Sequence, residues 1–270
     1  MHLVTEPTRM MAYCPVPKAA STTWRNTFAN MNLIEDVDIR KRSKKLCSKK
    51  NCFRANRFGD LAQLNSLNIV KFIFVRHPFE RLASAYNDKF VIYRNATGFQ
   101  KDVKLGEFYL NKIRSYQENY MNMTSSNLCF ADSYLEFTFF CFIEYVLDST
   151  NNEKLLSHVY SPIQIHWWPF TEICRVCDVQ YDLIGHIENF HEDLQILLTK
   201  FHDNKFLIEL YKNKTKSHCT ANCIEKTNET YLKYFQQLTK GTIMRLYRIY
   251  KNDFEFGGYD FPMKYIASGT

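Results

Sequence analysis

Two stretches in the first third of the chain place a short apolar run before a polar turn and a helix-like repeat. The first apolar run covers residues 10–16 (MMAYCPV) and the second covers residues 72–75 (FIFV). The apolar residues that follow at spacings of three or four are Trp24, Phe28 and Met31 after the first run, and Leu82, Ala85, Tyr86 and Phe90 after the second. A short uninterrupted apolar run is typical of a parallel strand buried on both faces, and the later spacing is typical of an amphipathic helix. Both stretches are therefore predicted to fold as strand, turn and helix.

The pattern beyond residue 100 is mainly helical. Apolar residues recur at helical spacing over residues 105–116, 133–147, 187–201 and 239–253, and a strand is predicted over residues 181–187. Residues 158–170 (HVYSPIQIHWWPF) are aromatic without periodicity and residues 212–225 are polar, so both are predicted to be loops. The expected fold class is α/β, with a P-loop-like central parallel sheet flanked by helices and a helix-rich C-terminal half.

Length and composition are consistent with one folded domain. The chain has 270 residues, of which 46% are hydrophobic and 16% are aromatic, enough for one sizeable core. We expect residues 1–9 to form an N-terminal tail and residues 10–265 to form the domain. No window holds about 18 uninterrupted apolar residues, the length that a membrane-spanning helix needs.

The turn after the first apolar run, within residues 15–24 (PVPKAASTTW), has the composition of an anion site. The first N–H groups of a helix lack partners within the helix, and the helix dipole makes that end positive. The contributing residues are a cation, three hydroxyl donors and two small residues that let an anion approach the backbone: Lys18, Ser21, Thr22, Thr23, Ala19 and Ala20. The loop has no glycine and is not a Walker A motif, and an ordinary strand-to-helix turn with an exposed lysine is the alternative.

The second turn carries an arginine at the carboxyl end of a strand, where open α/β sheets bind ligands. Arg76 follows the apolar run, Pro78 suits the first turn of a helix, and Ser84 lies about two turns into that helix. An arginine at the strand end and a serine on the helix can hold one phosphate through charge-assisted hydrogen bonds. The second turn thus strengthens the interpretation of the first as an anion site.

The motifs P-K-A-A-S-T-T-W at residues 17–24 and F-V-R-H-P-F-E-R-L-A-S-A-Y at residues 74–86 closely resemble the two cofactor motifs of Golgi carbohydrate sulfotransferases. The nearest branch is that of the chondroitin/dermatan 4-O- and HNK-1-type enzymes. The resemblance continues through HWWP at residues 166–169, YDLIG at 181–185 and LYRIYKNDF at 246–254, and covers most of residues 10–262. His77 stands where this branch commonly has an acidic residue, and residues 19–21 (AAS) replace a more usual Val-Gly-Cys turn. These departures concern the acceptor sugar more than the cofactor.

The resemblance implies 3′-phosphoadenosine 5′-phosphosulfate (PAPS) as the sulfate donor, and no metal. The implied donor-binding residues are Pro17, Lys18, Ala19, Ala20, Ser21, Thr22 and Thr23 for the 5′-phosphosulfate, and Arg76 and Ser84 for the 3′-phosphate. The enzyme would be a sulfotransferase that moves the sulfuryl group in line to a sugar hydroxyl, with Lys18 stabilising the leaving oxygen. Its partner would be an anionic polysaccharide or glycan, with a chondroitin-like glycosaminoglycan favoured, and not nucleic acid.

The general base of such a reaction has several candidates. His166 and His77 lead, because a histidine titrates near neutral pH, and Glu80 is a third candidate. For His77 the alternative is a structural role at the start of the helix that Pro78 opens. For His166 the alternative is a hydrogen-bonded histidine in a packed loop.

Acceptor binding has two sets of candidates. Trp167 or Trp168 would stack on a sugar ring, with packed loop aromatics as the alternative. Residues 40–57 hold nine Lys or Arg residues and no acidic residue, and include Lys44 and Lys45. A basic rim there would attract a polyanionic acceptor, whereas a solvated surface loop is the alternative.

Sequons and cysteines favour the secretory pathway. The asparagines of N-x-[ST] sequons are Asn95, Asn122, Asn213 and Asn228. The nine cysteines form local couples with Cys14 left over: Cys47/Cys52, Cys129/Cys141, Cys174/Cys177 and Cys219/Cys223. Disulfides are favoured over a zinc site built from C-x-x-C and C-x-x-x-C. The resemblance implies the Golgi lumen, reached through a type II membrane anchor that is missing from these residues, with secretion as the alternative.

Two other classes compete with the sulfotransferase interpretation. A non-catalytic polyanion-binding protein on the same fold would keep the basic surface without turnover. A P-loop-type kinase would also hold phosphates after a strand. It needs a glycine-rich Walker sequence and a carboxylate for Mg²⁺ near the loop, and neither is evident.

Overall fold

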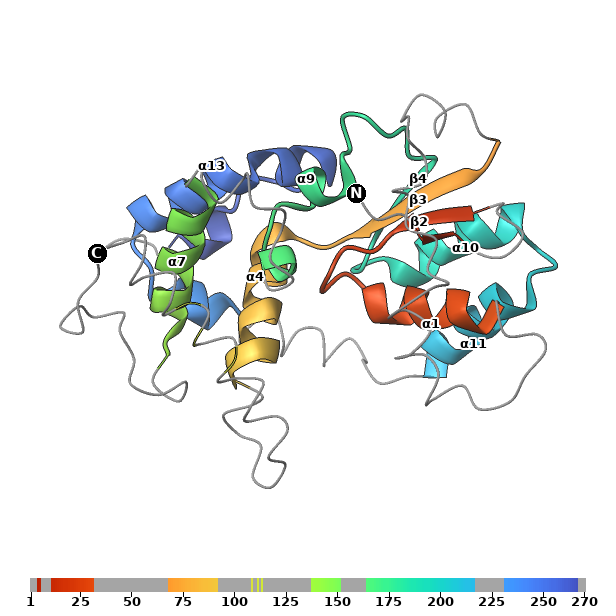
Figure 1. The fold of residues 1–270 in the computed structure, drawn as a ribbon, viewed down its shortest axis with the longest axis horizontal. Coiled ribbons are helices and arrows are strands. Elements are labelled where there is room, and N and C mark those ends of the chain that lie inside the picture. The colour runs from red at the N-terminus through yellow and green to blue at the C-terminus, as the bar shows by residue number, and fades with distance from the viewer. Residues whose placement is uncertain are drawn as a thin grey trace, which may run out of the picture. The chain divides into compact units, whose positions relative to one another are not determined.

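The computed structural model describes residues 4–5, 11–31, 68–91, 108, 111, 113, 137–151, 164–216 and 231–266. The described residues form a small four-stranded sheet and many helices, which confirms the α/β class in its general form (Figure 1). The chain divides into two compact units, each made of segments distant in sequence. The first unit contains Met1–His77, Pro169–Ile224 and Asn252–Tyr259, and the second contains Pro78–Trp168, Glu225–Lys251 and Asp260–Thr270. The single domain expected over residues 10–265 stays a prediction.

The first unit is built on a sheet with the strand order β1-β2-β3-β4. Its three parallel strands are β2 (Met11–Cys14), β3 (Val70–Val75) and β4 (Leu183–His186). β1 (Val4–Thr5) pairs antiparallel with β2, so part of the predicted N-terminal tail joins the sheet. The strands predicted over residues 10–16, 72–75 and 181–187 are confirmed, and the sheet also has an antiparallel edge strand.

Both faces of the central strands are buried, as their uninterrupted apolar runs predict. All four residues of β2 and the last five residues of β3 are buried. On one face the ring centroid of Trp24 lies 4.7 Å from that of Phe72 and 5.2 Å from that of Phe74. The helices α1 (Ser21–Met31), α10 (Phe190–Lys200) and α11 (Lys205–Lys216) supply the other core residues of this face (Figure 1). The aromatic core thereby packs α1 against the strands that precede the two turns.

Two elements differ from the sequence prediction. The loop predicted over residues 212–225 is wrong at its start, because residues 212–216 complete α11, whose Leu207 and Leu210 join the core. The helix predicted over residues 133–147 is α7 (Phe139–Asn151). The N–H of Cys141 donates to the Thr138 hydroxyl (3.2 Å), an N-cap contact that places the helix start at residue 139.

A buried carboxylate holds the short helix α9 (Phe170–Cys174) against the end of α13 (Lys240–Phe256) in the first unit. Asp253 accepts hydrogen bonds from the N–H groups of Phe170 and Thr171, both at 2.9 Å, and from the Thr171 hydroxyl at 2.7 Å. These donors offset the cost of burying the charge and cap the first turn of α9. Glycine ends this helix, since α13 stops directly before Gly257 and Gly258 has a φ of 64°.

The second unit is helical and aromatic. It contains α4 (Pro78–Tyr86), the π-helical turn Asn87–Val91, α7, the 3₁₀ turn Gln164–His166 and the 3₁₀ turn Met263–Tyr265. α4 and its π-helical turn confirm the helix predicted after the second apolar run. Ring pairs such as Phe79 and Phe235, stacked with centroids 5.0 Å apart, form its core. The aromatic residues around position 140 are thus mainly packing residues, as the all-round apolar pattern of α7 indicates.

The cysteine pairing differs from the local couples. Cys14 at the end of β2 forms a disulfide with Cys174 at the end of α9, with a Cα–Cα distance of 5.9 Å. Cys14 is therefore not left over, and the Cys174/Cys177 couple is wrong because the Cys177 thiol is free and exposed. The fold brings together two cysteines that are 160 residues apart in the sequence. The other expected couples each include a residue outside the described ranges: Cys47/Cys52, Cys129/Cys141 and Cys219/Cys223.

The features that bear on compartment lie mostly beyond the described residues. Asn213 lies in α11, whereas Asn95, Asn122 and Asn228 fall outside the described ranges. No helix within those ranges has the length and apolar character to cross a membrane. Over the same residues, no group of three or more His, Cys, Asp or Glu side chains is arranged to hold a metal ion.

Candidate functional site

The loop between β2 and α1 has a backbone shape that L-amino acids rarely adopt. Lys18 and Ala20 have positive φ angles of 69° and 57°. Glycine enters this left-handed region without a steric penalty but other residues do not, so surrounding contacts must hold both residues there. One such contact comes from the buried Tyr13 of β2, whose hydroxyl donates to the Ala19 carbonyl (3.3 Å). Burial raises the pKa of Tyr13, so its phenol keeps its proton and remains a donor.

This loop leads directly into the N-terminus of α1. The first backbone hydrogen bond of the helix runs from the Trp24 N–H to the Ala20 carbonyl (3.1 Å). The N–H groups of residues 21–23 come before it and are not part of the hydrogen-bond series within the helix. A left-handed residue next to right-handed ones turns successive N–H groups inward and forms an anion-binding concavity. The helix dipole adds positive potential at the same place. The loop therefore has the geometry of an anion site although it lacks glycine.

Arg76 follows the neighbouring strand at the same edge of the sheet. β2 and β3 are parallel and pair Cys14 with Ile73, so the loop of Lys18 and the turn of Arg76 both leave the carboxyl edge. Both Lys18 and Arg76 are half-buried. Open α/β sheets bind ligands at this edge. The two predicted anion-binding turns thus follow adjacent strands of one sheet.

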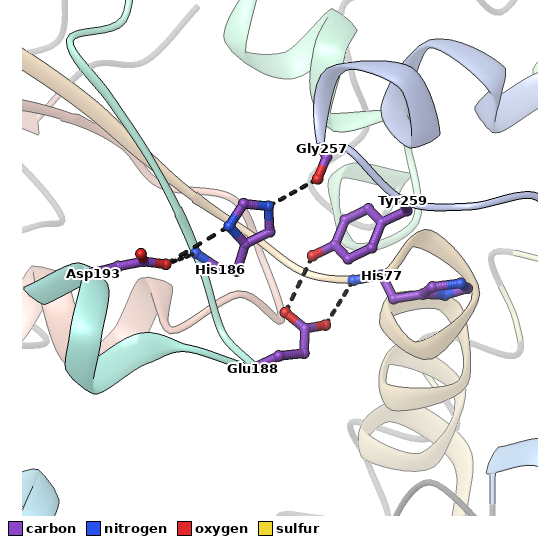
Figure 2. Close-up of polar contacts among 6 residues, drawn as sticks. All are labelled: His77, His186, Glu188, Asp193, Gly257 and Tyr259. Carbon is purple, nitrogen blue, oxygen red and sulfur yellow. Dashed lines mark hydrogen bonds and ion pairs between the residues drawn. The ribbon is translucent and has the colours of Figure 1, made fainter.

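A third segment at this edge follows β4. Glu188 lies two residues beyond the strand and accepts hydrogen bonds from the backbone N–H of His77 (3.1 Å) and from the Tyr259 hydroxyl (3.2 Å) (Figure 2). The carboxylate therefore ties the end of β4 to the turn after β3 and to the segment after α13. Glu188 is not among the site residues that the sequence predicts. The rule that selected Arg76, polar chemistry directly after a predicted strand, also selects Glu188.

His186, the last residue of β4, makes further contacts at the same edge of the sheet. Its Nε2 lies 2.8 Å from the Gly257 carbonyl oxygen, and its backbone N–H donates to Asp193 of α10 at 2.6 Å (Figure 2). The Asp193 carboxylate also lies 3.7 Å from Nδ1 of His186. The turn after α13 and the start of α10 are thus both anchored on the last residue of β4.

The two histidines proposed as bases have different surroundings. His77 is 8% exposed, and its ring packs edge-on against Phe254 and Tyr259, with centroid distances of 5.1 and 5.3 Å. This packing favours the structural alternative for His77. His166 lies in the second unit and is half-buried, and its carbonyl accepts a hydrogen bond from Arg81 (3.3 Å).

Residues 166–168 are held through their backbone within the second unit. The fully buried guanidinium of Arg81 donates to the carbonyls of His166 and Trp168, and the Tyr250 hydroxyl donates to the carbonyl of Trp167. Buried carbonyls need such donors, because an unpaired one is costly. Arg81 therefore anchors the loop of residues 166–168 through its backbone.

The remaining candidates are placed as follows. Trp167 is fully buried with its ring edge-on to Phe142 at 5.3 Å, and Trp168 is 6% exposed, so both pack as the loop-aromatic alternative expects. Ser84 lies in α4 and is 8% exposed. Glu80 is buried and pairs with Lys264 (3.5 Å) in the second unit. The basic segment with Lys44 and Lys45 lies outside the described residues.

Comparison with known proteins connects this edge of the sheet to a family. A family model described as the sulfotransferase family matches residues 1–260. This chain belongs to the sulfotransferase family. The match covers both predicted anion-binding turns and the segment with Glu188, and it confirms the family resemblance seen in the motifs.

Individual sulfotransferases are related at 26–29% identity. Carbohydrate sulfotransferase 10 of Gallus gallus is 29% identical over 261 residues, which cover 93% of this chain and 64% of that protein. Carbohydrate sulfotransferase 11 of Rattus norvegicus is 29% identical over 267 residues, covering 97% and 68%. Carbohydrate sulfotransferase 12 of Xenopus laevis is 26% identical over 282 residues, covering 97% and 60%. This sulfotransferase-family chain thus spans about two thirds of the length of these relatives. No solved structure matches it.

Proposed function

We propose that this protein is a carbohydrate O-sulfotransferase with a P-loop-like fold that uses PAPS as its donor. The observation that carries the proposal is the pair of turns at Lys18 and Arg76, which follow adjacent parallel strands in a chain of the sulfotransferase family. A donor with a phosphosulfate at one end and a phosphate at the other has the two anionic groups that such turns bind. No metal is required for this chemistry.

The backbone around Lys18 fits the 5′-phosphosulfate of the donor. The left-handed residues Lys18 and Ala20 and the first-turn N–H groups of α1 form the kind of concavity that binds a tetrahedral anion. Pro17 and Ala19 complete the loop, and the hydroxyls of residues 21–23 are further donors. Arg76 and Ser84 are assigned to the 3′-phosphate by the resemblance of their motif to the family pattern.

The reaction transfers a sulfuryl group directly to a sugar hydroxyl. The hydroxyl oxygen forms a bond to sulfur, the bond from sulfur to the bridging phosphate oxygen breaks, and the hydroxyl proton passes to a base. Lys18 and the first-turn N–H groups stabilise the charge that develops on the bridging oxygen. His166 is the preferred base, because packing of the His77 ring against Phe254 and Tyr259 favours a structural role for His77.

The acceptor is proposed to be a glycosaminoglycan or a glycoprotein glycan, with a chondroitin-like chain favoured. Relatives named carbohydrate sulfotransferases support a carbohydrate acceptor. The basic segment that contains Lys44 and Lys45 would attract such a polyanion. Trp167 and Trp168 would reach a sugar ring only if the loop opened, since both are buried. The Golgi lumen is the proposed compartment, reached through a type II membrane anchor.

Binding and transfer assays test the proposal. The protein should bind 3′-phosphoadenosine 5′-phosphate without metal and should move labelled sulfate from PAPS to at least one member of a panel of desulfated glycosaminoglycans. Preference for ATP with Mg²⁺ would indicate a kinase. Binding of the polysaccharide without binding of the nucleotide would indicate a non-catalytic polyanion-binding protein. Either of these results contradicts the proposal.

Single variants separate the roles of the two turns. Lys18→Ala should lower kcat by about 10²–10³, the usual effect of removing one preorganised donor, with nucleotide affinity much less affected. Arg76→Ala and Ser84→Ala should weaken nucleotide binding first. Lys200→Ala is the matched control, because Lys200 is an exposed lysine at the end of α10 in the same unit as Lys18.

A further inference from the structure

The backbone of Arg76 is held on both sides by the segment after β4. The Val75 carbonyl accepts a hydrogen bond from the Ile187 N–H (3.0 Å), and the His77 N–H donates to the Glu188 carboxylate (3.1 Å). The His77 N–H belongs to the peptide group whose carbonyl is that of Arg76. The Glu188 carboxylate therefore fixes the plane of the peptide that leaves Arg76, and so restricts the direction in which its side chain starts.

The Glu188 carboxylate is itself oriented by a second donor. Its other oxygen accepts a hydrogen bond from the Tyr259 hydroxyl (3.2 Å), as Figure 2 shows. The Tyr259 ring lies edge-on to both His77 and His186, with centroid distances of 5.3 and 5.6 Å. Nε2 of His186 lies 2.8 Å from the Gly257 carbonyl, two residues before Tyr259. Both carboxylate oxygens thus have partners on segments that pack together.

We propose that Glu188 is a positioning residue for the bond between Arg76 and the 3′-phosphate of the donor. This inference rests on the proposed function, because it assigns to Glu188 a role that acts through Arg76. Without the carboxylate, the peptide after Arg76 can rotate and the guanidinium samples more directions. Part of the 3′-phosphate contact is then lost, whereas the rest of the nucleotide is bound as before.

The sign of the effect separates positioning from plain electrostatics. A carboxylate near an anion site repels the ligand, so removing its charge should tighten the binding of every phosphate-bearing nucleotide. A positioning role predicts weaker binding instead, and only for nucleotides that carry a 3′-phosphate. Nucleotides that carry a 3′-phosphate should bind more weakly, whereas nucleotides that lack it should not.

The experiment measures the affinities of the intact protein for two nucleotides by calorimetry. The probes are 3′-phosphoadenosine 5′-phosphate and adenosine 5′-phosphate, and the affinity ratio isolates the contribution of the 3′-phosphate. Glu188→Ala should lower this ratio by about three- to tenfold, the usual net effect of one hydrogen bond. Glu188→Gln should restore most of it, because its amide oxygen still accepts from the His77 N–H. In the transfer assay, KM for PAPS should rise with kcat nearly unchanged.

Two further variants complete the test. Tyr259→Phe removes the hydroxyl that orients Glu188 and should lower the ratio by less than Glu188→Ala does. Glu192→Ala removes an exposed carboxylate on the first turn of α10 and should leave the ratio unchanged. In the Arg76→Ala background, Glu188→Ala should have no further effect on the ratio, since contacts that act through one residue are not additive.

The outcomes distinguish this inference from the proposed function. If Arg76→Ala lowers the ratio and Glu188→Ala does not, the inference is overturned and the donor assignment stands. Equal weakening of both nucleotides by Glu188→Ala means a structural role and also overturns the inference. If Arg76→Ala itself leaves the ratio unchanged, the donor assignment of Arg76 fails, and the role of Glu188 fails with it.

Discussion

The disulfide between Cys14 and Cys174 is a sensitive test of how the first unit is stabilised. It joins the last residue of β2 to the last residue of α9, and both residues are fully buried. Cys14 lies one residue before the loop that begins at Pro15, so the bond holds the strand from which the Lys18 loop departs. We predict that the double variant Cys14→Ala/Cys174→Ala lowers the free energy of unfolding substantially.

The size of the effect follows from the separation of the two cysteines. They lie 160 residues apart, so the bond closes a long loop in the unfolded chain. The chain-entropy relation assigns such a loop about 5 kcal/mol at 25 °C, and the measured loss for a native disulfide is typically about 2–5 kcal/mol. Alanine is preferred to serine in this variant, because a buried hydroxyl without a partner would add a separate penalty. We therefore expect a loss of about 2–5 kcal/mol.

The assay is urea unfolding of the intact protein with and without the double substitution, followed by circular dichroism. Cys177→Ala is the matched control and should change the free energy of unfolding by less than about 0.5 kcal/mol, because Cys177 is an exposed free thiol. Non-reducing peptide mapping should recover a peptide that contains Cys14 linked to one that contains Cys174. Recovery of a Cys174–Cys177 link, or equal destabilisation by the control, would refute this reasoning.

Three further substitutions test the backbone and the core of the first unit. Ala20→Gly should raise the free energy of unfolding by about 0.5–1 kcal/mol, because glycine avoids the penalty of a φ of 57°. Gly185→Ala should lower it by about 1–3 kcal/mol, since the added Cβ would lie 2.6 Å from the Phe74 ring in the aromatic core. Asp253→Asn should lower it by about 2–4 kcal/mol, because an amide N–H would face the donors that cap α9. Urea unfolding measures all three.

Each substitution has a counterpart that should behave differently. Ala19→Gly changes the neighbouring buried residue and should destabilise by about 0.5–1 kcal/mol, the entropic cost of glycine. Gly241→Ala meets its nearest atom at 3.6 Å and should be neutral or stabilising. Asp178→Asn removes an exposed ion pair with Arg175 and should cost less than about 1 kcal/mol. Equal effects within any pair would contradict the corresponding explanation.

The sequence was informative where local chemistry dictates local structure. The apolar runs around Tyr13 and Phe74 predict strands buried on both faces, and the spacing from Trp24 onward predicts the helix that covers one of those faces. The composition of the Lys18 loop predicts an anion site. The absence of glycine excluded a Walker A motif but gave no sign of the left-handed conformation, which Ala20 adopts without glycine.

Contacts between distant segments were beyond the reach of the sequence. Cys174 pairs with Cys14 because α9 meets the end of β2, and the spacing of the C-x-x-C motif contains no information on that contact. The hydrogen bond from His77 to Glu188 joins residues 111 positions apart. Its two partners lie on different strand ends, so only the pairing of β3 with β4 brings them together. Local periodicity does not specify which strands become neighbours.

The long separation of Cys14 from Cys174 along the chain has a consequence for biosynthesis. The ribosome releases the chain from its N-terminus, so in the proposed lumenal compartment Cys14 would be exposed to oxidation well before Cys174 emerges, and Cys47, Cys52 and Cys129 would be its first available partners. Transient mispairing followed by exchange is the expected maturation route, and a disulfide isomerase should accelerate it. Pulse-labelled chains on non-reducing gels should pass through species that become uniform only after the C-terminal segment has been made.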